Sequence, residues 1–561
     1  MIKLRNNNTI CALVINIIII IIYFSLFNIV LETNDEFAFS AFLSGAYGES
    51  SPYMVFSNVF YGMFLKIFYS LEIGVNWYSI FQILLNFISF SVITYIILMR
   101  TEKYERKIIR CIFCFSLVLF LGYQHYYLMQ FTKSAYLIAL AGILSILYAL
   151  NDNRSNKWVV FGCLLVLFGS FIRFSSVYVV LAFAFFRCAY DLIILQRFSL
   201  KKNYIVKNIR YVVSFFIMLV LIFGFDIADN MMYKHNTNSE QWTYYNQYNV
   251  ARSELLDYGI PDYEKHKEEY YKLGLSEVDI KMLNNWTFSD PEVFNLETLE
   301  KIIELKENDK LLIIQVVKNT IKNVFEGIKT NIGFMTMIAI FLFCICGNGK
   351  QRILGLLYIT MTLLLYGYLS YIDRVIFRSE YGIWLSMFIL LIYDYPMISN
   401  MNLASKRLMK TVWTTIMAVI IVLSIKTYVE NHERFNIGIQ DRYWQLFDYT
   451  NIHQENLYMR DVSTLSDWNR GYSTLQALPQ GYLSNIYLLG GWEIENPNTN
   501  VERKFGVYNP WRECIDSDVI YIIDNQGIEL KLKYIKQHYC STAKAIQVND
   551  VAGFKIYKIV S

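Results

Sequence analysis

Residues 10–37 read ICALVINIIIIIIYFSLFNIVLETNDEF, an uncharged apolar run followed at once by three carboxylates. The run over residues 10–31 is about 22 residues long, enough for a helix to cross a hydrocarbon core about 30 Å thick. Two basic residues precede it, and Glu32, Asp35 and Glu36 come directly after it. Because cytoplasmic flanks carry the excess of lysine and arginine, this pattern predicts a cytoplasmic N-terminus and an acidic stretch on the outer side.

The composition extends this membrane pattern to the rest of the chain. The protein has 561 residues, of which 55% are hydrophobic and 17% charged, a balance that soluble domains rarely show. The first run is too long for a cleaved signal peptide, and no small-residue cleavage site follows it. The nine cysteines show no spacing typical of a metal site, although Cys514 and Cys540 allow one disulfide in the C-terminal region.

Charge bias predicts the topology of about eleven membrane-spanning helices. The proposed cytoplasmic loops hold about 19 lysines and arginines, whereas the short external loops hold only Lys66, Lys133, Arg173, Arg374 and Arg378. We therefore expect the N-terminus inside and the C-terminus outside. The predicted spans are residues 10–31, 78–99, 112–128, 134–150, 158–172, 177–195, 211–228, 332–346, 353–372, 381–397 and 411–429.

The predicted fold class is a polytopic α-helical membrane protein with a helical external loop region and a small C-terminal external α/β domain. The transmembrane domain is expected over residues 1–428, with external loops at 32–77 and 229–331, and the α/β domain over residues 429–561. An apolar stretch interrupted by a lysine, residues 53–71, is predicted as an interfacial helix. Short strands are predicted at residues 482–489, 519–523, 543–548 and 553–559.

The candidate chemistry lies on the outer side. An enzyme acting on a lipid-linked phosphate needs a carboxylate to take a proton from an acceptor hydroxyl and cations to hold the phosphate. Asp35 and Glu36 are the candidate carboxylates, and Arg173, Arg374 and Arg378 are the candidate phosphate ligands. Arginine suits phosphate because its planar guanidinium donates two parallel hydrogen bonds.

Further external residues allow two interpretations each. The i,i+4 spacing of Arg374 and Arg378 would put both on one helix face, where a structural pair with Glu380 is the alternative. Lys133 is a further candidate phosphate ligand, or an ordinary interfacial lysine. His125, in an external turn beside two tyrosines, would line a sugar site or belong to an aromatic belt.

This plan resembles that of the type C glycosyltransferases (GT-C), integral membrane enzymes that use polyprenyl-phosphate sugars. In that superfamily the first external loop carries the catalytic acid, often an aspartate followed by another acidic residue. Asp35-Glu36 stands where that motif would stand. The loop from Phe39 to Gly48 and the run from Asn284 to Asp290 are similar to segments of bacterial members found with surface-polysaccharide genes.

The resemblance implies an inverting transfer of a sugar from a polyprenyl-phosphate donor to a glycan or lipid-linked acceptor, at the outer face of the bacterial cytoplasmic membrane. Asp35 would be the base, Glu36 its helper or a metal or sugar contact, and Arg374 and Arg378 the phosphate ligands. The external loop lacks the Asp-x-Asp that holds a metal in some members. No metal ligand is assigned, a divalent metal cofactor stays open, and no nucleic-acid partner is expected.

Two other functions stay open at this point. A polysaccharide polymerase or ligase of the O-antigen or capsule type uses similar lipid substrates and external arginines. A transporter of lipid-linked glycans would need charges and broken helices near the bilayer midplane. The predicted spans carry few such charges, chiefly Arg187 and Asp191 towards the cytoplasmic end of one span.

Overall fold

The structure is a computed structural model and describes most of the chain. No structural statement below concerns the remaining residues. The described residues are 2–27, 29–102, 106–152, 154–194, 202–235, 239–306, 313–395, 418–419, 421–426, 429, 440–462 and 474–561.

The protein is a mostly helical, multi-pass membrane protein. Within the described residues, six helices are long and apolar enough to cross a membrane, or seven if the bent pair of α14 (Ile313–Lys329) and α15 (Asn331–Cys346) counts as one span. Ten of the predicted segments coincide with described helices, and most of the eleventh, at residues 411–429, lies outside the described residues. The helices are α1 (Ile2–Leu26), α4 (Trp77–Arg100), α5 (Lys107–Gly122), α6 (Phe131–Asn151), α7 (Asn156–Ile172), α8 (Phe174–Ala189), α9 (Lys202–Lys234), α15 (Asn331–Cys346), α16 (Gly349–Tyr371) and α17 (Phe377–Asp394).

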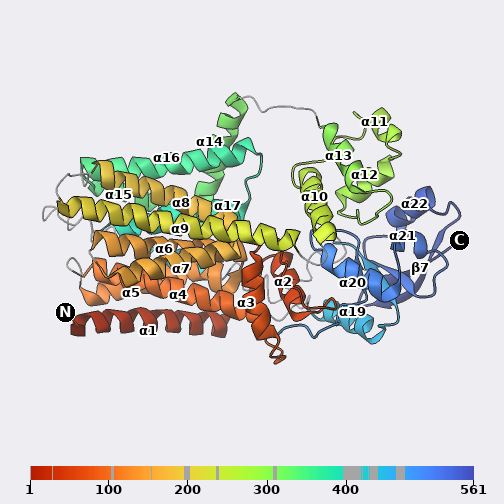
Figure 1. The fold of residues 1–561 in the computed structure, drawn as a ribbon, viewed down its shortest axis with the longest axis horizontal. Helices are drawn as coiled ribbons and strands as arrows, with labels where there is room; N and C mark the ends of the chain where they lie inside the picture. The colour runs from red at the N-terminus through yellow and green to blue at the C-terminus, as the bar shows by residue number, and fades with distance from the viewer. Residues whose placement is uncertain are drawn as a thin grey trace.

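These helices form one elongated bundle, and the remaining helices and the C-terminal sheet gather at one end of it (Figure 1). The central helix is α6, which is buried almost throughout and contacts α4, α7, α8 and α17. Its packing on α7 is close because both helices carry glycine at the crossing: a Cβ at Gly142 would lie 2.5 Å from the carbonyl oxygen of Gly162. Small residues allow this approach between membrane helices.

A buried ion cluster joins α17 to its neighbours, away from the end of the bundle that carries the C-terminal sheet. The Arg187 side chain on α8 lies 2.6 Å from Asp191 and 2.8 Å from Asp394, and none of the three is exposed. Tyr358 on α16 also donates to Asp394. Because these intramembrane charges are mutually paired, they hold α8, α16 and α17 together.

The other helices lie at or beyond the end of the bundle that carries the C-terminal sheet (Figure 1). After the first span, α3 covers only Val59–Tyr69, about 16 Å, too short to cross a bilayer. The described part of residues 229–331 is largely helical. The helices are α2 (Asn34–Ser44), α3 (Val59–Tyr69), α10 (Ser239–Leu256), α11 (Lys267–Lys272), α12 (Glu277–Asn284), α13 (Leu296–Glu304), α14 (Ile313–Lys329), α19 (Gln440–Ile452), α20 (Glu495–Phe505), α21 (Pro510–Glu513) and α22 (Glu529–His538).

The C-terminal region contains a mixed five-stranded sheet, and the four predicted strands are confirmed. Its order is β4-β3-β5-β7-β6, with β3 parallel to both neighbours and β7 antiparallel to β5 and β6. The sequence prediction missed the short, fully buried strand β3. The strands are β3 (Leu457–Arg460), β4 (Ile486–Leu488), β5 (Ile520–Asp524), β6 (Lys544–Val551) and β7 (Phe554–Val560).

Candidate active site

The acidic stretch after the first span forms the start of α2. Thr33 is the N-cap residue, and Glu36, three residues later, accepts hydrogen bonds from the Thr33 backbone N–H (3.3 Å) and hydroxyl (2.5 Å). This is the capping-box pattern, in which an acid three residues after the cap satisfies a free N–H at the helix start. Asp35 therefore sits in the first turn of α2, where the helix dipole favours negative charge.

Asp35 is buried and makes two polar contacts with distant parts of the chain. The Trp492 indole N–H donates to its Oδ1 at 2.8 Å, and Nη1 of Arg378 lies 3.8 Å from its Oδ2. Arg378 is in the first turn of α17, and Trp492 follows β4 in the C-terminal region. Three segments far apart in sequence thus converge on one carboxylate.

Arg173 is the second cation of this site. It lies at the junction of α7 and α8, donates to the backbone oxygen of Phe56 at 3.3 Å, and sits over the rings of Phe56 and Phe131. Burial, and then the nearby Arg378, lower the pKa of Arg173 to about 10. Two arginines beside a single carboxylate are an arrangement that is chemically suited to bind an added anion.

Burial raises the pKa of Asp35 above its ordinary value. Arg378, the Trp492 indole and Arg173, in that order, act against this rise because each stabilises the ionised carboxylate. A carboxylate with a raised pKa that stays beside cations is suited to accept a proton at neutral pH.

Both oxygens of Glu36 are engaged in structural hydrogen bonds. Oε2 accepts from Thr33, and Oε1 accepts from the backbone N–H of Phe131 at 2.9 Å, which ties α2 to the start of α6. Burial, and then Asp35, raise the pKa of Glu36 to about 8. At neutral pH Glu36 is therefore mainly protonated.

The raised pKa of Glu36 predicts a measurable pH dependence of stability. Because the folded state holds the proton up to about pH 8 and the unfolded chain releases it near 4.5, the contribution of Glu36 to stability falls as pH rises through that window. In Glu36→Gln this dependence is expected to vanish, so thermal unfolding in detergent changes less between pH 5 and 8. The exposed Glu297→Gln on α13 is the control, and an unchanged slope in Glu36→Gln would contradict the assignment.

The structure corrects the prediction that Arg374 and Arg378 share a helix face. Helix α17 begins at Phe377, so Arg374 lies in the preceding loop. Its guanidinium lies 3.0 Å from Asp257 and over the ring of Tyr258, just beyond α10. The alternative pair with Glu380 does not form either, since Glu380 accepts from Tyr366. Arg374 thus ties α10 to the bundle.

Lys133 and His125 are buried and have partners of their own. Lys133 Nζ lies 2.7 Å from Glu32 and donates to Gln124 at 2.5 Å. A short parallel pairing of β1 (Val30–Leu31) with β2 (Leu128–Met129) brings these groups together. His125 contacts the Tyr381 hydroxyl at 3.0 Å and is fully buried. Within the described residues, neither side chain makes a hydrogen bond or an ion pair with Asp35.

The sequence prediction missed the site residues that come from the C-terminal region. Besides Trp492, these include Glu493, which is buried with one carboxyl oxygen that makes no hydrogen bond to any described residue. Burial raises its pKa to about 7, and the neighbouring Arg460 acts against the rise. The only local signal was Gly490-Gly491 before Trp492, which indicates a close backbone approach but not its partner.

That close approach fixes where Trp492 lies. A Cβ at Gly490 would overlap the backbone oxygen of Trp286. Just beyond, the backbone N–H groups of Phe288 (2.8 Å) and Ser289 (2.9 Å) both donate to the oxygen of Leu489. The run from Asn284 to Asp290 therefore holds in place the turn before Trp492, so that the indole lies beside Asp35.

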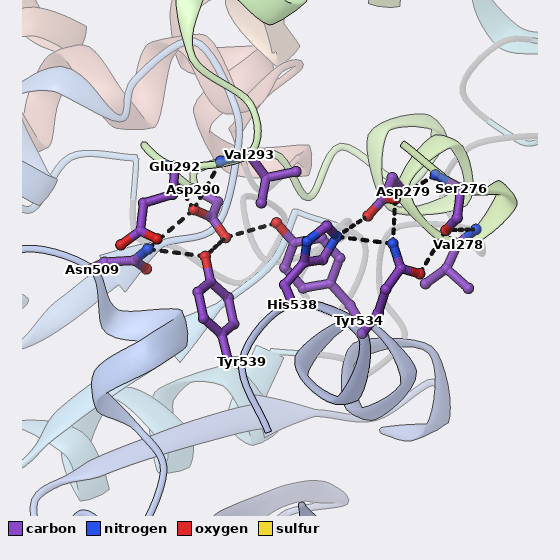
Figure 2. A network of polar contacts seen from close by, with 11 residues as sticks. Ser276, Val278, Asp279, Asp290, Glu292, Val293, Asn509, Tyr534, His538 and Tyr539 are labelled. Carbon is purple, nitrogen blue, oxygen red and sulfur yellow. Dashed lines mark hydrogen bonds and ion pairs between the residues drawn. The ribbon is translucent and has the colours of Figure 1, made fainter. Parts of the chain in front are cut away.

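Asp290 anchors this run to the C-terminal region (Figure 2). Its Oδ2 accepts from the hydroxyls of Tyr534 (2.7 Å) and Tyr539 (2.6 Å), and its Oδ1 accepts from the amide of Asn509 (3.2 Å). A second contact, between Asp279 and His538 at 2.7 Å, joins α12 to α22. The segment that contains Asp279 and Asp290 thus joins with the C-terminal region to hold Trp492 in position.

An apolar cavity of about 570 Å³ lies beside α17. Its walls come mainly from α1, α5, α17 and the turn between α14 and α15. Phe377 and Tyr381 line it, and they flank Arg378 in the sequence of α17.

No cluster of three or more histidine, cysteine, aspartate or glutamate residues within the described ranges is arranged to hold a metal ion. Cys514 and Cys540 are both free thiols, so the disulfide that the sequence allowed does not form.

Comparisons with known proteins give matches among solved structures only. No protein family matches the sequence, and no curated protein matches it. Among solved structures, the chain is similar to ArnT from Cupriavidus metallidurans in the apo state, with 9% identity and a TM-score of 0.39 over 98% of this chain and 97% of that one. At this score the likeness carries no inference about activity.

Proposed function

We propose that this protein is an inverting glycosyltransferase that moves a sugar from a polyprenyl-phosphate donor to a hydroxyl of a glycan or lipid-linked acceptor. The observation that supports this most is the convergence of Asp35, Arg378 and Arg173 from three distant segments. It supports roles for Asp35 as the proton acceptor and for the two arginines as phosphate ligands, which a single displacement at an anomeric carbon would require.

In the proposed reaction Asp35 takes the proton of the acceptor hydroxyl while its oxygen attacks the anomeric carbon. The bond from that carbon to the phosphate oxygen breaks, and the polyprenyl phosphate leaves with one more negative charge than it had in the donor. Arg378 and Arg173 stabilise this developing charge, which is larger in the transition state than in the bound donor. Attack opposite the leaving group inverts the anomeric centre.

The apolar cavity beside α17 supports a lipid-borne donor. Its volume of about 570 Å³ suits part of a prenyl chain, and Phe377 and Tyr381 bring its wall next to Arg378 on the same helix. A donor with its tail in this cavity would present its phosphate towards Arg378. Glu36 and Lys133 would then act by shaping the site, through their bonds to Phe131, Glu32 and Gln124, and not by touching the sugar.

We extend the proposal to topology and location. Eleven spans, a cytoplasmic N-terminus and an external C-terminal domain over residues 429–561 would place Asp35 at the outer face of a bacterial cytoplasmic membrane. The charge bias of the loops supports this orientation.

A transfer assay tests the proposal. The purified chain in nanodiscs is incubated with radiolabelled undecaprenyl-phosphate sugars and with lipid-linked glycans, and the labelled product is separated from released polyprenyl phosphate. We expect transfer from monophosphate-linked sugars. Transfer only from diphosphate-linked oligosaccharides, unaffected by changes at Asp35, would instead indicate a polymerase or ligase.

Trp492→Phe is expected to move the acid limb of the pH–rate profile to higher pH by about one unit. The phenyl ring keeps the contacts with Phe39 and Phe56 but removes the N–H that stabilises ionised Asp35. Hydrogen bonds to charged groups contribute about 1.5–3 kcal/mol, and one pKa unit corresponds to about 1.4 kcal/mol. Trp384→Phe, which loses an indole bond of 2.8 Å to Tyr366, is the matched control and should leave the profile in place.

A further inference from the structure

Helix α14 presents three different faces along its length. The first packs on the bundle: Asn323 donates to Ser370 on α16 at 3.0 Å, and Gly327 lies against Tyr366 and Trp384. The second face is apolar and open. It carries Ile313, Val317, Ile321 and Phe325, spaced by four residues and between 52% and 82% exposed. We call these four residues the apolar row of α14.

The third face is basic. Lys318, Lys322 and Lys329 lie on the side of the helix next to the apolar row and away from the bundle, and Lys329 pairs with Glu326 at 2.7 Å. A helix with an exposed apolar row beside a lysine-rich face is the pattern of helices that lie in a membrane interface.

The angle between α14 and α15 points to the same arrangement. The two helices are joined by a single residue and bend by 96°. Because α15 runs along the bundle, α14 lies across it, at the end near the external elements (Figure 1). With α15 crossing the membrane, α14 is therefore close to parallel with the membrane plane.

We propose that α14 is an interfacial helix whose apolar row is inserted in the leaflet on the side of the C-terminal sheet, with Lys318 and Lys322 at the level of the lipid phosphates. The occupant of the apolar row is the bilayer itself. The row would otherwise expose large aliphatic and aromatic side chains to water, and insertion by about 5–10 Å removes them from it. The lysines reach the headgroups with their apolar stems along the same surface.

The C-terminal end of α14 lies at the apolar cavity. Lys329, Thr330, Asn331 and Ile332, at the bend between α14 and α15, line that cavity. A helix seated in the leaflet at this bend holds the cavity mouth at the depth of the headgroups. The proposal does not depend on the reaction proposed above, since it concerns only how the chain sits in lipid.

Photocrosslinking tests the position of each face in the complete chain. Benzoylphenylalanine is introduced singly at residues 317, 321 and 325 of the apolar row, at residues 315, 318 and 322 of the polar side, and at the exposed Tyr271 of α11 as a control. The variants are reconstituted in nanodiscs of phosphatidylethanolamine and phosphatidylglycerol and irradiated. We expect at least tenfold more lipid adduct at the apolar row than at the other positions. Similar yields around the whole helix, as for a re-entrant segment, or adducts with protein alone would overturn the proposal.

The lysine contacts have their own readout. At residue 321 the adducts should be enriched in phosphatidylglycerol relative to its share of the nanodisc. The double variant Lys318→Gln and Lys322→Gln should remove this enrichment while the helical periodicity of the adducts stays. An enrichment that survives the double variant would overturn the role of the lysines.

Discussion

Replacing Asp35 with asparagine is expected to lower the rate of sugar transfer by about 10²–10⁴, the usual contribution of a general base. Asparagine keeps an oxygen that accepts from Trp492, so the buried contact and the start of α2 are retained. The change removes only the group that can take the proton of the acceptor. Thermal stability in detergent should be kept, because burial already disfavours the ionised form of Asp35.

The matched variant is Glu36→Gln, one residue along the same helix. Since both oxygens of Glu36 serve Thr33 and Phe131, its loss of activity should stay well below that of Asp35→Asn. Initial rates at saturating acceptor and donor measure both variants. Full activity in Asp35→Asn would remove the proposed base, and equal losses in the two variants would show that the pair acts as a unit.

Arg378→Met is expected to lower kcat/KM by about 10²–10³, as when one preorganised donor to a developing negative charge is removed. Within the described residues the Arg378 guanidinium makes no hydrogen bond, and it approaches Asp35 only as an ion pair at 3.8 Å. Its N–H groups are thus available to a phosphate. The ion pair also favours the ionised form of Asp35. Without it, the acid limb of the pH–rate profile should move to higher pH.

Arg374→Met is the control for this experiment. It removes a guanidinium four residues away that is already paired with Asp257, so the main expected effect is a looser link between α10 and the bundle, seen as a lower thermal midpoint. Measured side by side with labelled donor, the two variants distinguish phosphate binding from structural support. A larger kinetic loss in Arg374→Met than in Arg378→Met would reverse the assignment.

Part of the site follows from the sequence because it depends on local chemistry. The Thr33–Glu36 spacing predicts the start of a helix, and the acidic stretch after the first apolar run predicts carboxylates at the membrane surface. The same reasoning did not separate Arg374 from Arg378. Spacing of four residues suggested one helix, whereas α17 begins only at Phe377 and the loop before it turns Arg374 towards Asp257.

The external cations show the limit of charge counting. Lys133, Arg374 and Arg378 look alike as basic residues of external loops, yet the structure pairs Lys133 with Glu32 and Arg374 with Asp257. These acids belong to other segments, and nothing in the local sequence assigns them to one cation rather than another. Only the packing of the chain decides which guanidinium remains for a ligand.

The sequence by itself determined the membrane character, the positions of ten apolar helices and four of the five strands of the C-terminal sheet. These properties depend on the hydrophobicity and periodicity of residues that are close together in the sequence. The tertiary structure alone decided that Trp492, 457 residues after Asp35, donates to that carboxylate. Such a contact depends on the docking of the Asn284–Asp290 run and the C-terminal region onto the segment that follows the first span. Burial at that junction, and no local pattern, raises the pKa of Asp35.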